Sequence, residues 1–325
     1  MKFVVFGPES RVGLLNADKV LDLASAANAS ADGPLRSAGG GQFMFTSLLH
    51  LIESGDRGLD AARTLNEAFA GSGEPGVELD VASVRLRAPF PGQRLALAGA
   101  NYADHVAQAF TNFGQPITPE ATYEQARQKM MGGFWVVSPP VGSGARIEVP
   151  SRANGLFDYE GEVAIVLGKG GKRLKADDWT DRIWGSTLLI DWSVRSSSLG
   201  EGRQPFYTQK IFDGSKSLGP CISVGEVDPG DIDVETRVNG EIRQQFNTSK
   251  MMYSFAEVLE HLSQDLTLLA GDVLSGGTGA GTAFDTTVPE ADGTIPRDLF
   301  LDAGDEVELS SPVHGSLTAS IVASK

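Results

Sequence analysis

The sequence contains little cysteine, little positive charge and no long apolar run. Its 325 residues include a single cysteine, Cys221, which excludes an internal disulfide framework and a cysteine-rich zinc site. Lys and Arg number 27 against 42 Asp and Glu, and the formal net charge of −15 disfavours nucleic acid as a partner. No apolar stretch approaches the ~18 residues of a membrane-spanning helix, and the opening MKFVVFGPES lacks a secretory leader pattern. We therefore expect a cytoplasmic protein that binds neither nucleic acid nor a membrane.

The first part of the chain predicts a small α+β unit. Residues 1–27 are rich in β-branched side chains and predict a short β unit. Residues 47–70 carry apolar side chains at helical spacing with a break near Gly55, which predicts two helices. The Ala, Ser and Gly content of residues 28–42 predicts a loop, and GSGEPG at 71–76 predicts a linker.

The remainder of the chain has a different texture. From about residue 80, short β-type segments alternate with Gly and Pro turns, and helical periodicity is confined to about 118–130 and 250–262. The expected fold class is therefore mixed and β-dominated. We expect a small N-terminal domain at 1–78 and a larger domain at 79–325.

Three carboxylates are the first candidates for chemistry. Residues two apart in a strand point to one face, so Glu160 and Glu162 would place two carboxylates side by side. Such close like charges repel unless a cation lies between them or one is protonated. A solvated strand face with alternating glutamates explains the spacing equally well. Asp191 ends the apolar segment 183–190, and three carboxylates without a His or Cys cluster favour a hard cation if they converge.

Several motifs together resemble the signature of the fumarylacetoacetate hydrolase family. The pair of glutamates in E-G-E at 160–162 is followed by D-W-S-V-R at 191–195. Further segments agree with the family in order and spacing over residues 80–322: N-Y-x-x-H at 101–105, K-x-F-D at 210–213 with L-G-P at 218–220, V-N-G-E at 238–241 with Gln245 and N-T at 247–248, L-x-x-G-D-V at 268–273 with G-T at 277–278, and G-D-x-V-E at 304–308.

The resemblance implies a β-roll catalytic domain and a homodimer. It implies that Glu160, Glu162 and Asp191 bind a divalent cation, with Mg²⁺ as the first choice and Mn²⁺ or Ca²⁺ as alternatives. It also implies that Lys210 is catalytic and holds the 2-oxo acid end of the substrate together with the metal. The residues that it implies for substrate binding are Tyr102, Arg195, Asp213, Gly277 and Thr278. A cation, Lys210 and Arg195 would form one positive pocket in an acidic protein.

The histidine of the N-Y-x-x-H segment separates the reactions of the family. In its hydrolytic members this histidine is a general base toward water and pairs with a glutamate three residues later, on the same face of a helical turn. The resemblance implies this role for His105, but residue 108 is glutamine, whose neutral amide stabilises an imidazolium ion less. A longer stretch at 109–137 would form a lid, and Glu120 or Glu124 on it is a hypothetical substitute for the missing glutamate.

Three functional hypotheses follow. The first is a divalent-metal-dependent hydrolase that cleaves a C–C bond in a small 1,3-dicarbonyl or 2-oxo acid, acylpyruvate-like or fumarylpyruvate-like, through a metal-stabilised enolate. The alternative is a lyase of the same family, a 2-oxo-3-deoxy sugar acid dehydratase or a 2-oxo acid decarboxylase, motivated by Gln108 and by altered segments at 196–198 and 275–281. The third is a non-catalytic small-molecule-binding relative, against which the complete carboxylate set and Lys210 argue.

Overall fold

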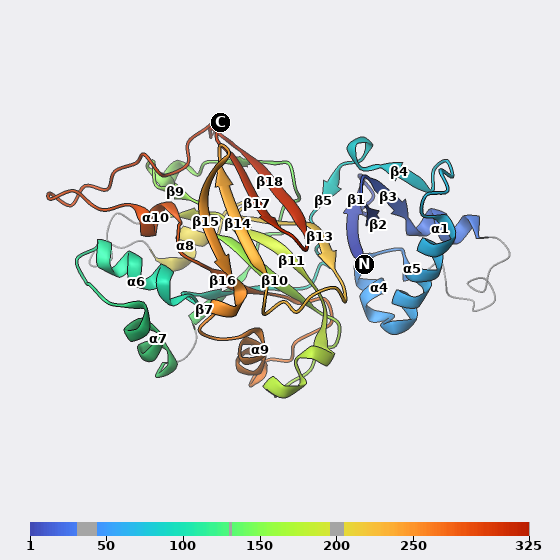
Figure 1. The fold of residues 1–325 in the computed structure, drawn as a ribbon, viewed down its shortest axis with the longest axis horizontal. Coiled ribbons are helices and arrows are strands. Elements are labelled where there is room, and N and C mark those ends of the chain that lie inside the picture. Colours follow the sequence, from blue (N-terminus) through green and yellow to red (C-terminus); the bar gives the residue numbers. More distant parts are fainter. Residues whose placement is uncertain (31–43, 130–131, 196–204, 325) are drawn as a thin grey trace.

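The computed structural model describes residues 1–30, 44–129, 132–195 and 205–324, which form two lobes joined by one sheet (Figure 1). Within these ranges no helix combines the length and apolar character needed to cross a membrane. Three sequence expectations fall at least partly outside them. These are the loop at 28–42, the methionines Met130 and Met131 of the expected lid, and the altered positions 196–198.

The smaller lobe contains the two helices that the sequence predicts and a β unit that ends at Asp22, because residues 23–29, the first five of which the sequence predicts in the β unit, form a helix. Gly55 separates the helices with φ of 58°, a conformation that other residues adopt at a steric cost. Asp22 ends the third strand and caps the following helix, because its carboxylate accepts the backbone N–H groups of Ala24 and Ser25. The elements are β1 (Lys2–Phe6), β2 (Arg11–Asn16), β3 (Lys19–Asp22), α1 (Leu23–Ala29), α4 (Leu48–Glu53), α5 (Asp56–Phe69) and β4 (Glu78–Asp80).

The larger lobe is β-dominated, as the sequence predicts. Its helices are α6 (Ala103–Asn112), α7 (Pro119–Arg127), α8 (Phe206–Lys210), α9 (Phe255–Ser263) and α10 (Ala283–Thr286). Periodicity found α7 and α9 but not the other three. Its strands are β5 (Leu86–Arg87), β6 (Leu95–Gly99), β7 (Gly132–Val136), β8 (Ala145–Glu148), β9 (Phe157–Asp158), β10 (Gly161–Leu167), β11 (Ile183–Asp191), β12 (Ser193–Val194), β13 (Lys216–Ser223), β14 (Asp233–Val238), β15 (Glu241–Asn247), β16 (Val273–Thr278), β17 (Glu306–Ser311) and β18 (Gly315–Val322).

One long sheet runs through both lobes in the order β4-β3-β2-β1-β13-β11-β10-β16-β6-β7, with β5 paired to β1. The lobes are connected where β1 pairs antiparallel with β13, through Lys2 opposite Ser223 and Phe3 opposite Ile222. A second sheet has the order β15-β14-β17-β18-β8, and β9 and β12 form a separate pair. The N-terminal strands thus extend the sheet of the larger lobe, and the domain boundary at residue 78 stays a prediction.

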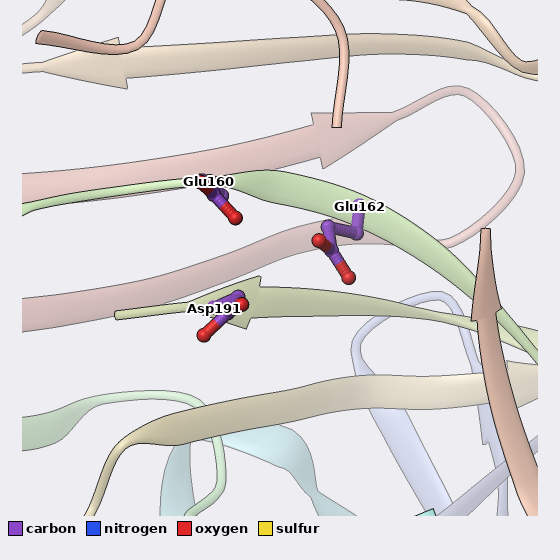
Figure 2. Close-up of side chains that lie close together, drawn as sticks. All are labelled: Glu160, Glu162 and Asp191. Carbon is purple, nitrogen blue, oxygen red and sulfur yellow. The ribbon is translucent and has the colours of Figure 1, made fainter. Parts of the chain in front are cut away.

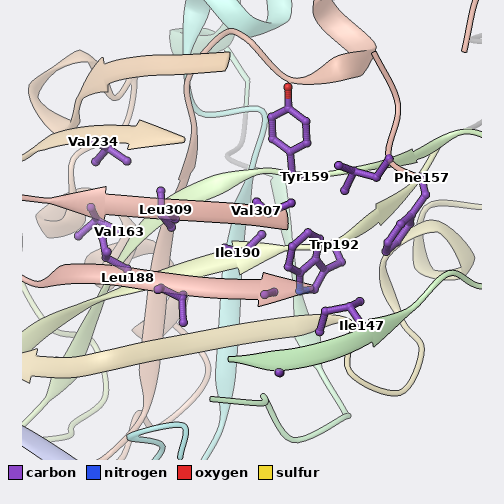
Figure 3. Packing of buried hydrophobic residues seen from close by; sticks show 14 of the residues in the cluster. Ile147, Phe157, Tyr159, Val163, Leu188, Ile190, Trp192, Val234, Val307 and Leu309 are labelled. Atoms are coloured by element: carbon purple, nitrogen blue, oxygen red, sulfur yellow. The ribbon is translucent and has the colours of Figure 1, made fainter. Parts of the chain in front are cut away.

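The centre of the larger lobe explains how the candidate carboxylates are oriented. Side chains alternate along β10, so Val163 and Ile165 enter the core between the two sheets, whereas Ala164 joins the core on the opposite face (Figure 3). The same alternation on β11 sends Leu188 and Ile190 into the inter-sheet core. Even-numbered positions of β10 and odd-numbered positions of β11 therefore share the other face, where the carboxylates lie.

Candidate metal centre and acid-base pair

The three candidate carboxylates converge. Glu160 directly precedes β10, Glu162 lies on it, and Asp191 ends the neighbouring strand β11. The backbone N–H of Asp191 donates to the Glu160 carbonyl oxygen at 2.9 Å. One oxygen from each carboxylate lies within 4.8 Å of the other two, and all three residues are buried (Figure 2). The glutamates therefore do not form the solvated strand face that the sequence left open.

Lys210 and Arg195 neutralise part of this acidic cluster. The Lys210 ammonium donates to Glu160 Oε2 at 2.6 Å, to Asp191 Oδ2 at 2.8 Å and to Ser193 Oγ at 2.6 Å. The Arg195 guanidinium contacts Glu160 Oε1 at 2.7 Å and donates to Asp158 Oδ2 at 2.8 Å. Burial opposes ionisation of Glu160, but the charges of Lys210, Arg195 and His105 outweigh burial and hold its pKa well below the ordinary value.

A further lysine lies beside the cluster, and sequence reasoning did not single it out. Lys216 begins β13 and is 1% exposed. Its ammonium lies 2.8 Å from Asp191 Oδ1 and donates to the carbonyl oxygens of Lys210 and Ser215 at 2.6 and 3.0 Å. Burial lowers its pKa, although the charge of Asp191 opposes this shift. The only sequence signal was a lysine at the edge of an apolar strand.

The donor set fits a divalent cation. Glu162 accepts a hydrogen bond from Ser275 Oγ, but no ion pair to it is present among the described residues. Burial, and then the charges of Asp191 and Glu160, raise the pKa of Glu162 well above its ordinary value. A buried carboxylate without a compensating charge, next to two others, is the environment in which a cation is stabilised. Oxygen ligands alone favour Mg²⁺, Mn²⁺ or Ca²⁺ over zinc.

His105 forms a buried acid-base pair, but its partner is a residue that the sequence did not indicate. His105 Nδ1 lies 2.6 Å from Oδ2 of Asp285 on α10, and Asp285 is completely buried. The Gly281 N–H donates to both carboxylate oxygens of Asp285, at 3.0 and 3.2 Å. The side chain of Asn112, at the end of α6, donates to the Asp285 carbonyl oxygen at 2.6 Å. These bonds hold α6 and α10 together and fix the imidazole.

The His105–Asp285 pair shows that the hypothesis of Glu120 or Glu124 as a substitute for the glutamate missing at position 108 is wrong. Gln108, Glu120 and Glu124 are all exposed, and the carboxylate at the imidazole is that of Asp285. Burial disfavours the charged imidazole, but the hydrogen bond and charge of Asp285 outweigh burial and raise the pKa of His105. The missing glutamate is thus replaced from a segment 180 residues away in the chain.

One cavity of about 230 Å³ brings most of the predicted site together. Its lining includes His105, Glu160, Glu162, Asp191, Arg195, Lys210 and Thr278. Asp213, in contrast, is exposed and does not line this cavity. Tyr102 and Gly277 do not line it either: Tyr102 is buried against Phe246, with ring centroids 5.1 Å apart, and Gly277 lies next to Asn101. Roles for these three in substrate binding stay predictions.

Comparison with known proteins supports the same family. The model of the fumarylacetoacetate hydrolase C-terminal domain matches residues 94–322. The chain is 31% identical over 286 residues to an oxaloacetate tautomerase, YisK, of Bacillus subtilis strain 168, covering 85% of this chain and 86% of the relative.

Solved structures share the whole fold. Fumarylacetoacetate hydrolase from Exiguobacterium antarcticum superimposes with a TM-score of 0.69 at 25% identity, and each chain is covered completely. Maleylpyruvate hydrolase from Sphingobium sp. SYK-6, solved with manganese(II) and pyruvate, superimposes with a TM-score of 0.69 at 21% identity, again over the whole of both chains. From the matched domain and the extent of this similarity, the chain belongs to the fumarylacetoacetate hydrolase family.

Proposed function

We propose that this protein is a divalent-metal-dependent enzyme that transfers a proton at the carbon next to the 2-oxo group of a small 2-oxo acid. Enol–keto tautomerisation of oxaloacetate is the first activity to test. The observation that carries this proposal is the His105–Asp285 pair, which shares one cavity with three buried carboxylates, Lys210 and Arg195. The cavity thus combines a proton acceptor with a site for an anionic substrate.

Each residue of the cavity has a chemical task in this proposal. Glu160, Glu162 and Asp191 would hold the cation, Mg²⁺ or Mn²⁺, which would draw negative charge toward the oxygens of the 2-oxo acid. Lys210 supplies a positive charge to the substrate carboxylate. In the tautomer that carries its proton on Nδ1, His105 would donate to Asp285, and Nε2 would accept a proton from the substrate carbon. Asp285 would stabilise the imidazolium ion, and Nε2 would then deliver the proton to the 2-oxo oxygen, which gives the enol. The same two transfers in reverse order convert the enol to the keto form.

Tautomerisation requires no group beyond the residues of the cavity and the cation that they would hold. It needs a base at the carbon and stabilisation of negative charge on the 2-oxo oxygen, whereas hydrolysis also needs an activated water. The name of the Bacillus subtilis relative, an oxaloacetate tautomerase, also supports testing tautomerisation before hydrolysis.

Hydrolytic C–C cleavage of an acylpyruvate is the second candidate. The specific observation in its favour is again Asp285, because a histidine paired with a carboxylate is suited to activating water. The same residue removes the main motive for the lyase hypothesis, which was the neutral amide of Gln108.

The test uses the metal-stripped protein, resupplied with Mg²⁺ or Mn²⁺. Enol oxaloacetate is added and the loss of enol absorbance is followed against the same metal with His105→Ala protein, which controls for tautomerisation by free metal. We expect acceleration that requires metal and falls about 100-fold or more in the variant. Cleavage of acetylpyruvate without acceleration of oxaloacetate would replace the proposal with the hydrolase. A folded, metal-loaded protein inert toward both would refute it.

A further inference from the structure

The cavity of about 230 Å³ that the three carboxylates line is called the metal cavity below. A second, larger hollow is continuous with it. Its volume is about 540 Å³, which lies within the range of small-molecule sites in proteins. The two hollows share five lining residues, Gly99, Ala100, Val106, Phe110 and Gln115. A molecule bound in the metal cavity can therefore extend past Val106 and Phe110 into the second hollow. Figure 1 shows the helices α6 and α7, which border it, at the side of the larger lobe remote from the N-terminal lobe.

The outer wall of the second hollow is attached firmly to the body of the larger lobe. Arg127, at the end of α7, donates to the carbonyl oxygen of Met252 at 3.1 Å and to Glu257 at 2.7 Å. The Tyr253 hydroxyl lies 2.5 Å from the carbonyl oxygen of Ala126 and 2.7 Å from that of Lys129, and its one proton can be donated to either of them. Arg127 also lies over the Tyr253 ring, 5.0 Å from its centroid. Side chains on both sides of the hollow thus hold its shape.

The lining of the second hollow differs chemically from that of the metal cavity. Apolar side chains dominate it, including Val106, Phe110, Ile117 and Met252, and no acidic side chain lines it. Among the described residues, Lys129 is the only charged one in the lining, and that side chain is exposed to solvent. The metal cavity, in contrast, contains three carboxylates, Lys210 and Arg195. The combined space suits a molecule with an anionic head and an uncharged apolar tail.

We propose that the second hollow binds the apolar tail of a longer 2-oxo acid, whose head lies in the metal cavity. This inference rests on the proposed function, because a 2-oxo acid head bound in the metal cavity is what directs the tail into the second hollow. The natural substrate class is then a 2-oxo acid with an alkyl or aryl group at its far end, and oxaloacetate tests the head chemistry alone. Each methylene that leaves water in such a pocket strengthens binding about fourfold.

The test measures binding, so that it does not depend on turnover. The Mn²⁺-loaded full chain is titrated by calorimetry with pyruvate and with 2-oxooctanoate, which share a head and differ in tail length. We expect 2-oxooctanoate to bind at least tenfold more tightly. Ala126 is half-buried and lines the hollow, so A126W should reduce this preference to less than threefold. The matched control is A121W on the exposed face of the same helix, which should retain the full preference.

A second variant keeps the test decisive if A126W does not fold. I117D places a carboxylate beside the tail in the loop before α7 and should weaken 2-oxooctanoate binding at least fivefold. Equal wild-type affinities for the two acids, with metal-dependent pyruvate binding, would overturn this inference and leave the proposed function standing. A preference that survives both A126W and I117D would also overturn it. Absence of metal-dependent binding of either acid would overturn the proposed function and this inference together.

Discussion

Side chains are held in different ways on the two sides of the metal cavity. The strands β10 and β11 form one side, and the helices α6 and α7 form the other. On the strand side, Glu160, Glu162 and Asp191 are buried, and the backbone ladder of β10 and β11 holds their positions. On the helix side, exposed residues alternate with apolar ones, and the helices are attached by side-chain bonds such as that of Arg127 to Glu257. The sheet therefore positions the carboxylates that are proposed to bind the cation. The residues that are proposed to select the substrate tail lie on surface helices, where substitutions are better tolerated.

The strand side contains a contrast of its own. Asp191 contacts the ammonium groups of both Lys210 and Lys216, whereas Glu162 has no ion pair among the residues that the structure describes. Removing one partner of a buried ion pair leaves the other charge uncompensated, which is costly. Neutralising Glu162 leaves no lysine or arginine without its partner, because Glu162 forms no ion pair within the described ranges, and burial already raises its pKa. Glu162 and Asp191, two carboxylates proposed to hold the same cation, should thus differ sharply in their effect on folding.

The largest expected effect comes from neutralising these ligands. We expect Asp191→Asn and Glu162→Gln each to lower metal-dependent turnover about 1000-fold or more, because both remove an oxygen ligand and its charge. In the metal-free protein, denaturant unfolding should show that Asp191→Asn costs about 3 kcal/mol of stability whereas Glu162→Gln costs less than ~1 kcal/mol. Equal losses of stability would show that the ion pairs of Asp191 with the two lysines are unimportant.

A smaller effect on turnover is expected at the pair that faces the carboxylates. In Asp285→Asn the imidazole keeps a polar neighbour but loses the charge that stabilises the imidazolium ion. Turnover should fall roughly 100-fold, while metal affinity measured by calorimetry stays within about threefold of wild type. Calorimetry controls for collapse of the site, and a turnover within threefold of wild type would contradict a role for Asp285 in proton transfer.

The same pair predicts a pH-dependent stability. The pKa of His105 is raised in the folded protein above its ordinary value of about 6.5. Its contribution is therefore fully present below that pH and is lost as pH rises through the folded-state pKa. Denaturant unfolding of the metal-free protein should show a larger penalty for Asp285→Asn at pH 6 than at pH 9, because other losses in the variant do not depend on this titration. An equal penalty at both pH values would mean that Asp285 does not raise the pKa of His105.

Residues close in sequence were predictable, and residues brought together by the fold were not. The two-residue period of a strand was enough to place Glu160 and Glu162 on one face, and family motifs indicated Asp191 and Lys210. The four-residue helix α10 is too short for a periodic signal, whereas α6 has ten residues, one more than α7 and α9, and its periodicity was missed. Asp285 meets His105 only because the fold brings α10 against α6, where Asn112 donates to the Asp285 carbonyl oxygen. The sequence therefore predicted correctly that Glu160, Glu162 and Asp191 cluster, and their role as metal ligands stays a prediction. It did not indicate the segment that supplies the partner of His105.

The smallest expected effect is at the exposed glutamates of α7. Glu120 and Glu124 face solvent, and the site beside the His105 ring is already occupied by Asp285. Glu120→Gln and Glu124→Gln should therefore leave turnover and its pH dependence within about twofold of wild type, as expected for surface charges. A tenfold loss in either variant would mean that α7 moves toward the cavity during turnover and that its carboxylate acts there. The helix side would then take part in chemistry as well as in selection.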